Sequence, residues 1–236
     1  MTTKKIKPVE PFRGTFKERI KQIIKKPKEK FLTESQKEYW DILEKNQITL
    51  CLGPSGTGKS YVALKKAVDL LWDDNNKFEK IIIIRPAVES DDRSIGLLPG
   101  TLEEKMDPYI APSFYILNKI IGKESTQKLK EEGFIEVFSF NFLRGWTIDN
   151  SIVILEESQN TTPKQMKLFL TRIGFNSKFF ISGDIEQSDN HKNLKNSGLY
   201  DAKEKLIDLN GVGFFEFSIN DIVRNPLIGH ILERYR

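Results

Sequence analysis

The chain has 236 residues and a mass of 27.3 kDa, and 39% of its residues are hydrophobic and 11% aromatic. This is the composition of a folded protein with one large domain or two small ones. No apolar run approaches the roughly 20 residues that cross a bilayer, and the N-terminus lacks the apolar stretch of a secretory signal. The single Cys51 excludes an internal disulfide and a cysteine-based metal cluster. We therefore expect a cytoplasmic protein.

Charge is distributed unevenly along the chain. Residues 1–30 carry eleven Lys or Arg and three Asp or Glu, whereas the rest carries 26 basic and 30 acidic residues. This predicts two parts: a basic N-terminal arm over residues 1–30, disordered or helical, and a globular domain over residues 31–236. A basic arm is typical of proteins that contact nucleic acid by neutralising phosphates. The alternative, with equal weight, is a solvated leader.

Helical periodicity and short apolar runs alternate along the chain. The helices predicted in chain order are Phe16–Ile24, Glu34–Glu44, Lys59–Trp72, Pro108–Ile121, Pro163–Thr171, Gly198–Leu209 and Pro226–Tyr235. The strands predicted between them are Ile48–Leu52, Ile81–Ile84, Phe134–Phe138, Ile152–Leu155, Phe179–Ile181 and Phe214–Phe217. Residues 86–112 are rich in Gly and Pro and predict an irregular insertion, and Lys123–Glu132 predicts a surface loop or frayed helix. The alternation predicts an α/β fold with a mainly parallel sheet flanked by helices.

The strongest motif lies between the first strand and the helix that follows it. Residues 53–60 read GPSGTGKS and satisfy G-x-x-x-x-G-K-[ST] in full. Glycines let consecutive N–H groups wrap phosphates, and the helix adds its positive N-terminal end. In this P-loop NTPase reading Lys59 bridges the β and γ phosphates and Ser60 offers its hydroxyl to Mg²⁺. The predicted nucleotide-binding residues are Gly53, Pro54, Ser55, Gly56, Thr57, Gly58, Lys59 and Ser60.

Two polar motifs follow later strands. The sequence IVILEESQN places Glu156 and Glu157 at a carboxyl strand end, where ligands bind in parallel sheets. We predict that Glu156 holds Mg²⁺ through water and that Glu157 polarises the attacking water. In SGDIEQ, Gln187 is the candidate sensor of the γ-phosphate or the group that orients the water, and Asp184 is its support. The alternative is an ordinary turn built on Gly183 and Asp184, and the motif is weak in isolation.

Four arginines are candidates for stabilising the transferred phosphoryl group: Arg85, Arg144, Arg172 and Arg224. Each has two alternatives, a structural ion pair or a nucleic-acid contact. The aromatic residues Trp146 and Phe142 are candidates for stacking on bases, although core positions are the commoner role for such residues.

Taken together, the motifs resemble those of the PhoH family, the phosphate-starvation-inducible ATPases of bacteria and bacteriophages. The resemblance covers about residues 31–236 and depends on the ordered series GPSGTGKS, IIIIRPAVES, GLLPGTLEEKMDPY, FLRGWTI, LEESQN, QMKLFLTRIG, SGDIEQSD and DIVRNP. It implies a fold similar to a single motor lobe of superfamily 1 helicases. It also implies an ATPase that uses ATP and Mg²⁺, acts on RNA or single-stranded nucleic acid, and forms a homo-oligomer such as a ring. Its location would be the cytoplasm, that of the host for a viral protein.

The resemblance also assigns individual residues. Gln36 matches the glutamine that reads adenine, and Glu157 matches the catalytic acid. Gln187 belongs, with Gly183 and Asp184, to the motif that couples the γ-phosphate to the nucleic acid. Arg172 and Arg224 match arginines expected near the nucleotide or a subunit boundary.

One position departs from the family. The family usually has Asp-Glu-Ala-Gln where this chain has Glu156-Glu157-Ser158-Gln159, so the first acid is one methylene longer. Two alternatives to a helicase-like ATPase stay open, the first because of this longer acid and the second because phosphate loops also occur in kinases. One is a nucleotide-gated switch that binds RNA or protein with little turnover. The other, disfavoured by Gln159 and Gln187, is a small-molecule kinase.

Overall fold

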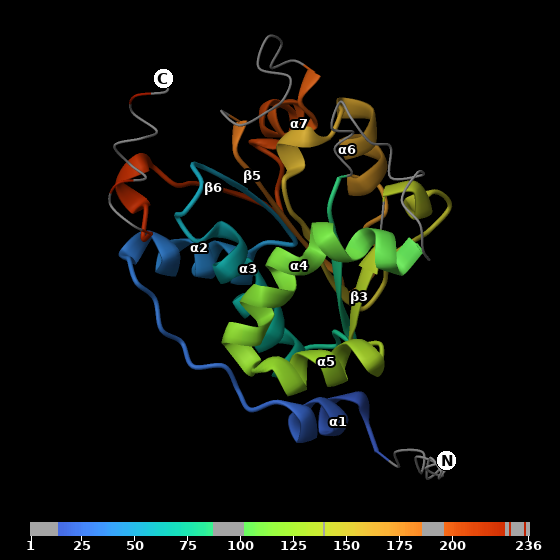
Figure 1. Cartoon of the computed structure of the whole chain (residues 1–236). Coiled ribbons are helices and arrows are strands. Elements are labelled where there is room, and N and C mark those ends of the chain that lie inside the picture. The colour runs from blue at the N-terminus through green and yellow to red at the C-terminus, as the bar shows by residue number, and fades with distance from the viewer. Residues whose placement is uncertain are drawn as a thin grey trace.

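A six-stranded sheet forms the centre of the molecule (Figure 1). The computed structural model describes residues 14–86, 102–138, 140–185 and 196–224, together with residues 227 and 234. The strand order is β3-β2-β4-β5-β1-β6, and every neighbouring pair is parallel. From one edge to the other the strands are β3 (Ile135–Phe138), β2 (Lys80–Ile84), β4 (Ser151–Leu155), β5 (Lys178–Gly183), β1 (Ile48–Leu52) and β6 (Val212–Glu216). The predicted parallel α/β fold is confirmed.

Helices pack on both faces of the sheet (Figure 1). One side carries α1 (Phe16–Ile23), α2 (Glu34–Lys45), α3 (Lys59–Trp72), α4 (Leu102–Ile121) and α5 (Lys123–Glu131). The other carries α6 (Pro163–Leu170) and α7 (Gly198–Leu206). Among the described residues, no helix is long and apolar enough to cross a membrane.

Alternation along the strands divides the core into two clusters. In β4, Ile152 and Ile154 face the side of α3, whereas Val153 and Leu155 face the side of α6. Because both faces are covered, the strand is fully buried and reads as an uninterrupted apolar run. Glu156 comes next, and the same alternation directs it to the α3 side.

The described part of the basic N-terminal segment includes α1, which packs on the body. Ile20 and Ile24 lie one helical turn apart and are buried in the cluster that contains α3 and α5. Lys17 Nζ donates a hydrogen bond of 2.8 Å to the carbonyl of Leu71 at the end of α3. We therefore describe α1 with the body, while the predicted boundary near residue 31 stays a prediction.

The irregular insertion predicted over residues 86–112 was wrong at its end, because α4 begins at Leu102, six residues before the predicted helix start at Pro108. Of the two alternatives for Lys123–Glu132, the structure favours the helix, since Lys123–Glu131 form the regular helix α5. Pro and Gly content suggested a break. Packing prevails instead, because Ile110 and Leu117 of α4 and Leu129 of α5 are buried. Such long-range contacts override local propensity.

The remaining boundaries agree with the prediction to within a few residues. The helix predicted over Gly198–Leu209 ends at Leu206, and the last strand begins at Val212, two residues before the predicted start. Gly213 obscured that start, yet it is required because an added Cβ would overlap the side chains of Asn46 and Ile42. The helix predicted over Pro226–Tyr235 lies almost wholly outside the described residues.

Candidate functional site

The loop between β1 and α3 is folded around three glycines. Gly53, Gly56 and Gly58 have φ values of 137°, 93° and 96°, a region that side chains disfavour. At Gly53 an added Cβ would stand 2.6 Å from the carbonyl oxygen of Phe217, and at Gly58 it would stand 2.6 Å from Nε2 of Gln36. Glycine is therefore required at Gly53 and Gly58 for two reasons, the backbone conformation and the close packing of neighbouring atoms.

Lys59 lies over this loop. Its Nζ donates hydrogen bonds to the carbonyls of Gly53 (2.6 Å) and Pro54 (2.8 Å). Burial lowers the pKa of Lys59 below its ordinary value, and the carboxylates of Asp184 and Glu157 offset part of that shift. An anion placed here would meet a desolvated ammonium group and the N-terminus of α3.

A cavity of about 710 Å³ opens beside the loop. Every strand that ends next to it contributes the residues following its carboxyl end, as expected for a parallel sheet. The lining residues that the sequence analysis named are Gln36, Ser55, Gly56, Gly58, Lys59, Ser60, Arg85, Glu156, Glu157, Gly183, Asp184 and Arg224. The structure thus gathers most of the predicted site in one place.

The two acids differ in their surroundings. Glu156 is 2% exposed, and its Oε2 accepts a hydrogen bond from the hydroxyl of Ser113 on α4. Glu157 has a φ of 51°, which is uncommon for a residue with a side chain. Its Oε1 accepts from Nη2 of Arg85 at 3.1 Å, and its side chain is 44% exposed.

Gln159 connects the two acidic motifs. Its Nε2 donates to Oε2 of Glu157 (2.8 Å), and its Oε1 accepts from the backbone N–H of Asp184 (3.1 Å). Gly183 makes room for it, because an added Cβ would stand 2.5 Å from Oε1 of Gln159. Gln159 therefore links the carboxylate of Glu157 to the backbone that follows β5.

Gln36 contacts the loop as well as lining the cavity. Its Nε2 donates to the carbonyl of Thr57 (3.1 Å), and its Oε1 accepts from the backbone N–H of Leu32 (3.0 Å). Thr33 caps the start of α2, since its hydroxyl accepts from the N–H of Gln36 at 3.2 Å. The residue predicted to read adenine thus lies at the site, 2% exposed.

The predicted arginines separate into two pairs. Arg85 and Arg224 line the cavity, and Arg224 packs over Gly56, where an added Cβ would stand 3.2 Å from its Cδ. Arg172 lies beyond α6 and donates to the carbonyls of Leu168 and Trp146, at 3.2 and 3.0 Å. Neither Arg172 nor the exposed Arg144 lines the cavity. Gln187 lies outside the described residues.

The sequence analysis missed the contribution of α4. Ser113 holds Glu156, and Pro112, Tyr115, Ile116 and Lys119 form a wall of the cavity. No local motif marks these positions. The helix itself was predicted over Pro108–Ile121, but helical spacing alone does not indicate that this helix meets the acid after β4.

The oxygen donors of the cavity fit Mg²⁺. Ser60 and Glu156 both line it, and hydroxyl and carboxylate oxygens are ligands that this ion prefers. Within the described ranges no three His, Cys, Asp or Glu side chains gather to hold a metal. Ser60 and Glu156 are the residues of this cavity that could share a Mg²⁺ ion with bound phosphates.

Comparison with known proteins agrees with this geometry. The family model described as PhoH-like protein matches residues 29–236. The chain belongs to the PhoH family. A PhoH-like protein of Bacillus subtilis is 44% identical over 227 residues, which is 96% of this chain. One of Synechocystis is 42% identical over 203 residues, and Protein PhoH of Escherichia coli is 36% identical over 204, each 86% of this chain. The resemblance inferred from the motifs is confirmed.

The PhoH relatives are longer than this chain. The alignments span 70% of the Bacillus subtilis protein, 61% of the Synechocystis protein and 56% of the Escherichia coli protein. What those proteins do as wholes therefore comes to this chain only as a proposal.

Proposed function

We propose that this PhoH-family protein binds ATP with Mg²⁺, hydrolyses it, and acts on RNA or single-stranded nucleic acid. The observation that carries the proposal is the cavity itself. Lys59, two carboxylates and Arg224 surround it at the carboxyl ends of parallel strands, beside a phosphate loop with positive-φ glycines. A small-molecule kinase would also need a second substrate, and none of the observations above calls for one.

Each residue has a role that follows from its position. Lys59 would leave the loop carbonyls for the β and γ phosphates, a better partner for an ammonium group. Ser60 and Glu156 would hold Mg²⁺, which supplies charge neutralisation on the phosphate oxygens. Glu157, 44% exposed, can accept a proton from water in the cavity. Arg224 can stabilise charge on the γ-phosphate from within the same chain.

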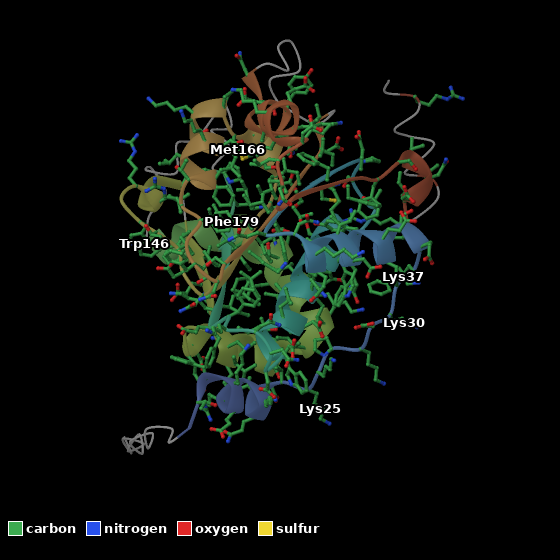
Figure 2. The ribbon with its side chains drawn as sticks, turned by 180° about the vertical axis from the view of Figure 1, so that it is seen from behind. Lys25, Lys30, Lys37, Trp146, Met166 and Phe179 are labelled. Carbon is green, nitrogen blue, oxygen red and sulfur yellow. The ribbon has the colours of Figure 1, made fainter. Side chains whose placement is uncertain are left out.

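The nucleic-acid part of the proposal depends on exposed lysines. Lys25, Lys28 and Lys30 lie exposed on the segment that joins α1 to α2. In the view of Figure 2, Lys25, Lys30 and Lys37 occur along one side of the molecule and Trp146 on the other. Such a row suits a phosphate backbone. Trp146, 42% exposed and packed edge-to-face on Phe138, does not extend it.

A homo-oligomer in the cytoplasm completes the proposal. Arg172 is remote from the cavity of its own chain, so a nucleotide contact by Arg172 requires a neighbouring subunit. Light scattering in ATP tests this, and a monomeric mass would count against it.

The first experiment is ATP turnover with Mg²⁺, with and without single-stranded RNA or DNA. Turnover that rises with nucleic acid and disappears in Lys59→Ala and Glu157→Gln supports the proposal. Failure of the native chain to bind ATP would contradict it.

A second candidate is the nucleotide-gated switch. It is favoured by the ion pair of Arg85 with Glu157 and by the engagement of Glu156 with α4, since both acids are already held by protein groups. Tight ATP binding with negligible turnover, together with a large gain of turnover in Glu156→Asp, would favour the switch over the motor.

A further inference from the structure

Ser113 occupies an unusual place for a buried polar residue. It lies on α4 with 0% exposure, between the buried Ile110 and Leu117 on the face that packs toward the sheet. Its hydroxyl donates to Oε2 of Glu156, which comes directly after β4. Two buried polar groups therefore satisfy each other where α4 packs against the sheet, next to the cavity that Glu156 lines.

Glu156 reaches α4 because of its direction and its length. It continues the alternation of Ile152 and Ile154, so its side chain lies on the face shared by α3 and α4. Its backbone N–H donates to the carbonyl of Ile84 (3.1 Å), which fixes its Cα at the end of the β2–β4 pairing. With the Cα fixed, an aspartate would be one methylene short of Ser113.

The same carboxylate also faces the cavity. Glu156 lines it together with Lys59 and Ser60, so it is shared between α4 and the position where phosphates would bind. A hydroxyl that donates to one oxygen of a buried carboxylate restricts the orientation of that carboxylate. We expect the other oxygen to be the one that faces the cavity, which Glu156 lines.

We propose that Ser113 is a positioning residue for Glu156, and that this Ser–Glu pair orients the carboxylate that holds the Mg²⁺ of bound ATP. The inference rests on the proposed function, because it assigns a partner to the metal-holding acid of that site. It also gives the longer acid a structural reason: its extra methylene is used to reach α4.

The test compares ATP affinity in Mg²⁺ with affinity in EDTA, using a fluorescent ATP analogue. The ratio of the two affinities reports metal-assisted binding without requiring turnover. In Ser113→Ala we expect the ratio to fall about tenfold, the lower end of the effect of losing a group that orients a metal ligand. Affinity in EDTA should stay unchanged, because Ser113 does not line the cavity.

Two further variants separate positioning from a loss of packing. Ser177→Ala removes another buried serine, whose hydroxyl donates to the carbonyl of Ile148 at 2.7 Å far from the cavity, and should lower Tm without changing the ratio. In a Glu156→Asp background, Ser113→Ala should add no further change in the ratio, since the shorter acid does not reach α4.

The outcomes are distinct. An unchanged ratio in Ser113→Ala, or an equal loss in Mg²⁺ and in EDTA, overturns the assignment and leaves the proposed function standing. A native chain whose ATP affinity is indifferent to Mg²⁺ also overturns it. A native chain that binds no ATP in either condition overturns the proposed function and the assignment together.

Discussion

The two ends of the sheet carry similar side chains with different partners. At the amino ends of the strands, three basic residues bond to the carbonyls of helix C-termini. Lys178 donates to the end of α2, Lys17 to the end of α3, and Arg172 to the end of α6. At the carboxyl ends, Lys59, Arg85 and Arg224 line the cavity instead.

Helix direction explains the difference. In a parallel sheet the helices run back against the strands, so their C-termini, with partial negative charge, gather at the amino edge. Cations there complete the fold. The N-terminus of α3 lies at the opposite edge, where partial positive charge joins Lys59 and favours an anion. The position in the topology, more than the residue type, therefore separates cations that bond to helix ends from cations that line the cavity.

The largest expected effect comes from removing one lysine at each edge of the sheet and comparing the two variants. Lys59→Ala should lower ATP turnover by about 10²- to 10³-fold, the usual loss when a preorganised electrostatic contact is removed. Lys178→Ala, also a partly buried lysine with a lowered pKa, should keep turnover and lose about 1–2 kcal/mol of unfolding free energy. Turnover assays and urea unfolding of both variants check this. Equal loss of turnover in both would contradict the separation of the edges.

The next effect concerns the acids. Glu157→Gln should lower turnover about 10²-fold while ATP affinity is retained, because only proton transfer is lost. The matched control is Glu136→Gln on β3, which removes an ion-paired carboxylate remote from the cavity. Single-turnover kinetics and equilibrium binding distinguish the two steps. A native turnover rate in Glu157→Gln would show that another group acts as the general base.

A smaller effect is expected at the arginines. Arg224→Ala should lower turnover about tenfold, the low end for an electrostatic contact at a partly exposed site. Arg172→Ala should leave ATP affinity unchanged and lower Tm, since its carbonyl partners lose their donor. Turnover assays measure the effect of Arg224→Ala. For Arg172→Ala, equilibrium ATP binding and thermal unfolding measure the two expected results, and turnover is followed at several protein concentrations. Concentration-dependent loss in Arg172→Ala would place that arginine at a neighbour's nucleotide.

The smallest effect is a pH dependence of ATP affinity. Burial lowers the pKa of Lys59, so in the free protein it loses its proton at a lower pH than an ordinary lysine, whose value is 10.5. Phosphates favour the ammonium form. ATP affinity should therefore fall a few-fold as the pH rises through the lowered pKa of Lys59, and the protein should take up protons when ATP binds. Calorimetry in two buffers of different ionisation enthalpy measures the uptake, and its absence would argue against Lys59 as the phosphate partner.

The sequence pattern predicted correctly those helices and strands whose limits are set by neighbouring residues in the chain. Ile48–Leu52 and Lys59–Trp72 agree with the structure to the residue, since a buried apolar run and a helical period flank an unambiguous loop. The phosphate loop and both acids were predicted for the same reason. The grouping of Arg224 with the loop came from the family resemblance alone.

The remainder depends on contacts between distant residues. Nothing near Ser113 indicates that it meets Glu156, 43 positions later in the chain. Likewise, the hydrogen bonds of Arg172 become visible only when α6 ends beside Trp146. Only the first turns of helix α4, residues 102–107, were mistaken for part of an insertion, because Gly and Pro content was weighed there; the helix was predicted correctly from Pro108 to Ile121.

Hydrogen–deuterium exchange with and without ATP and Mg²⁺ tests most directly the claim that the carboxyl edge binds the nucleotide. We predict protection of the backbone at 53–62 and 156–160, and no change at the amino edge over 143–150 and 171–177. Protection at the amino edge, or equal exchange in both conditions at 53–62, would contradict the account.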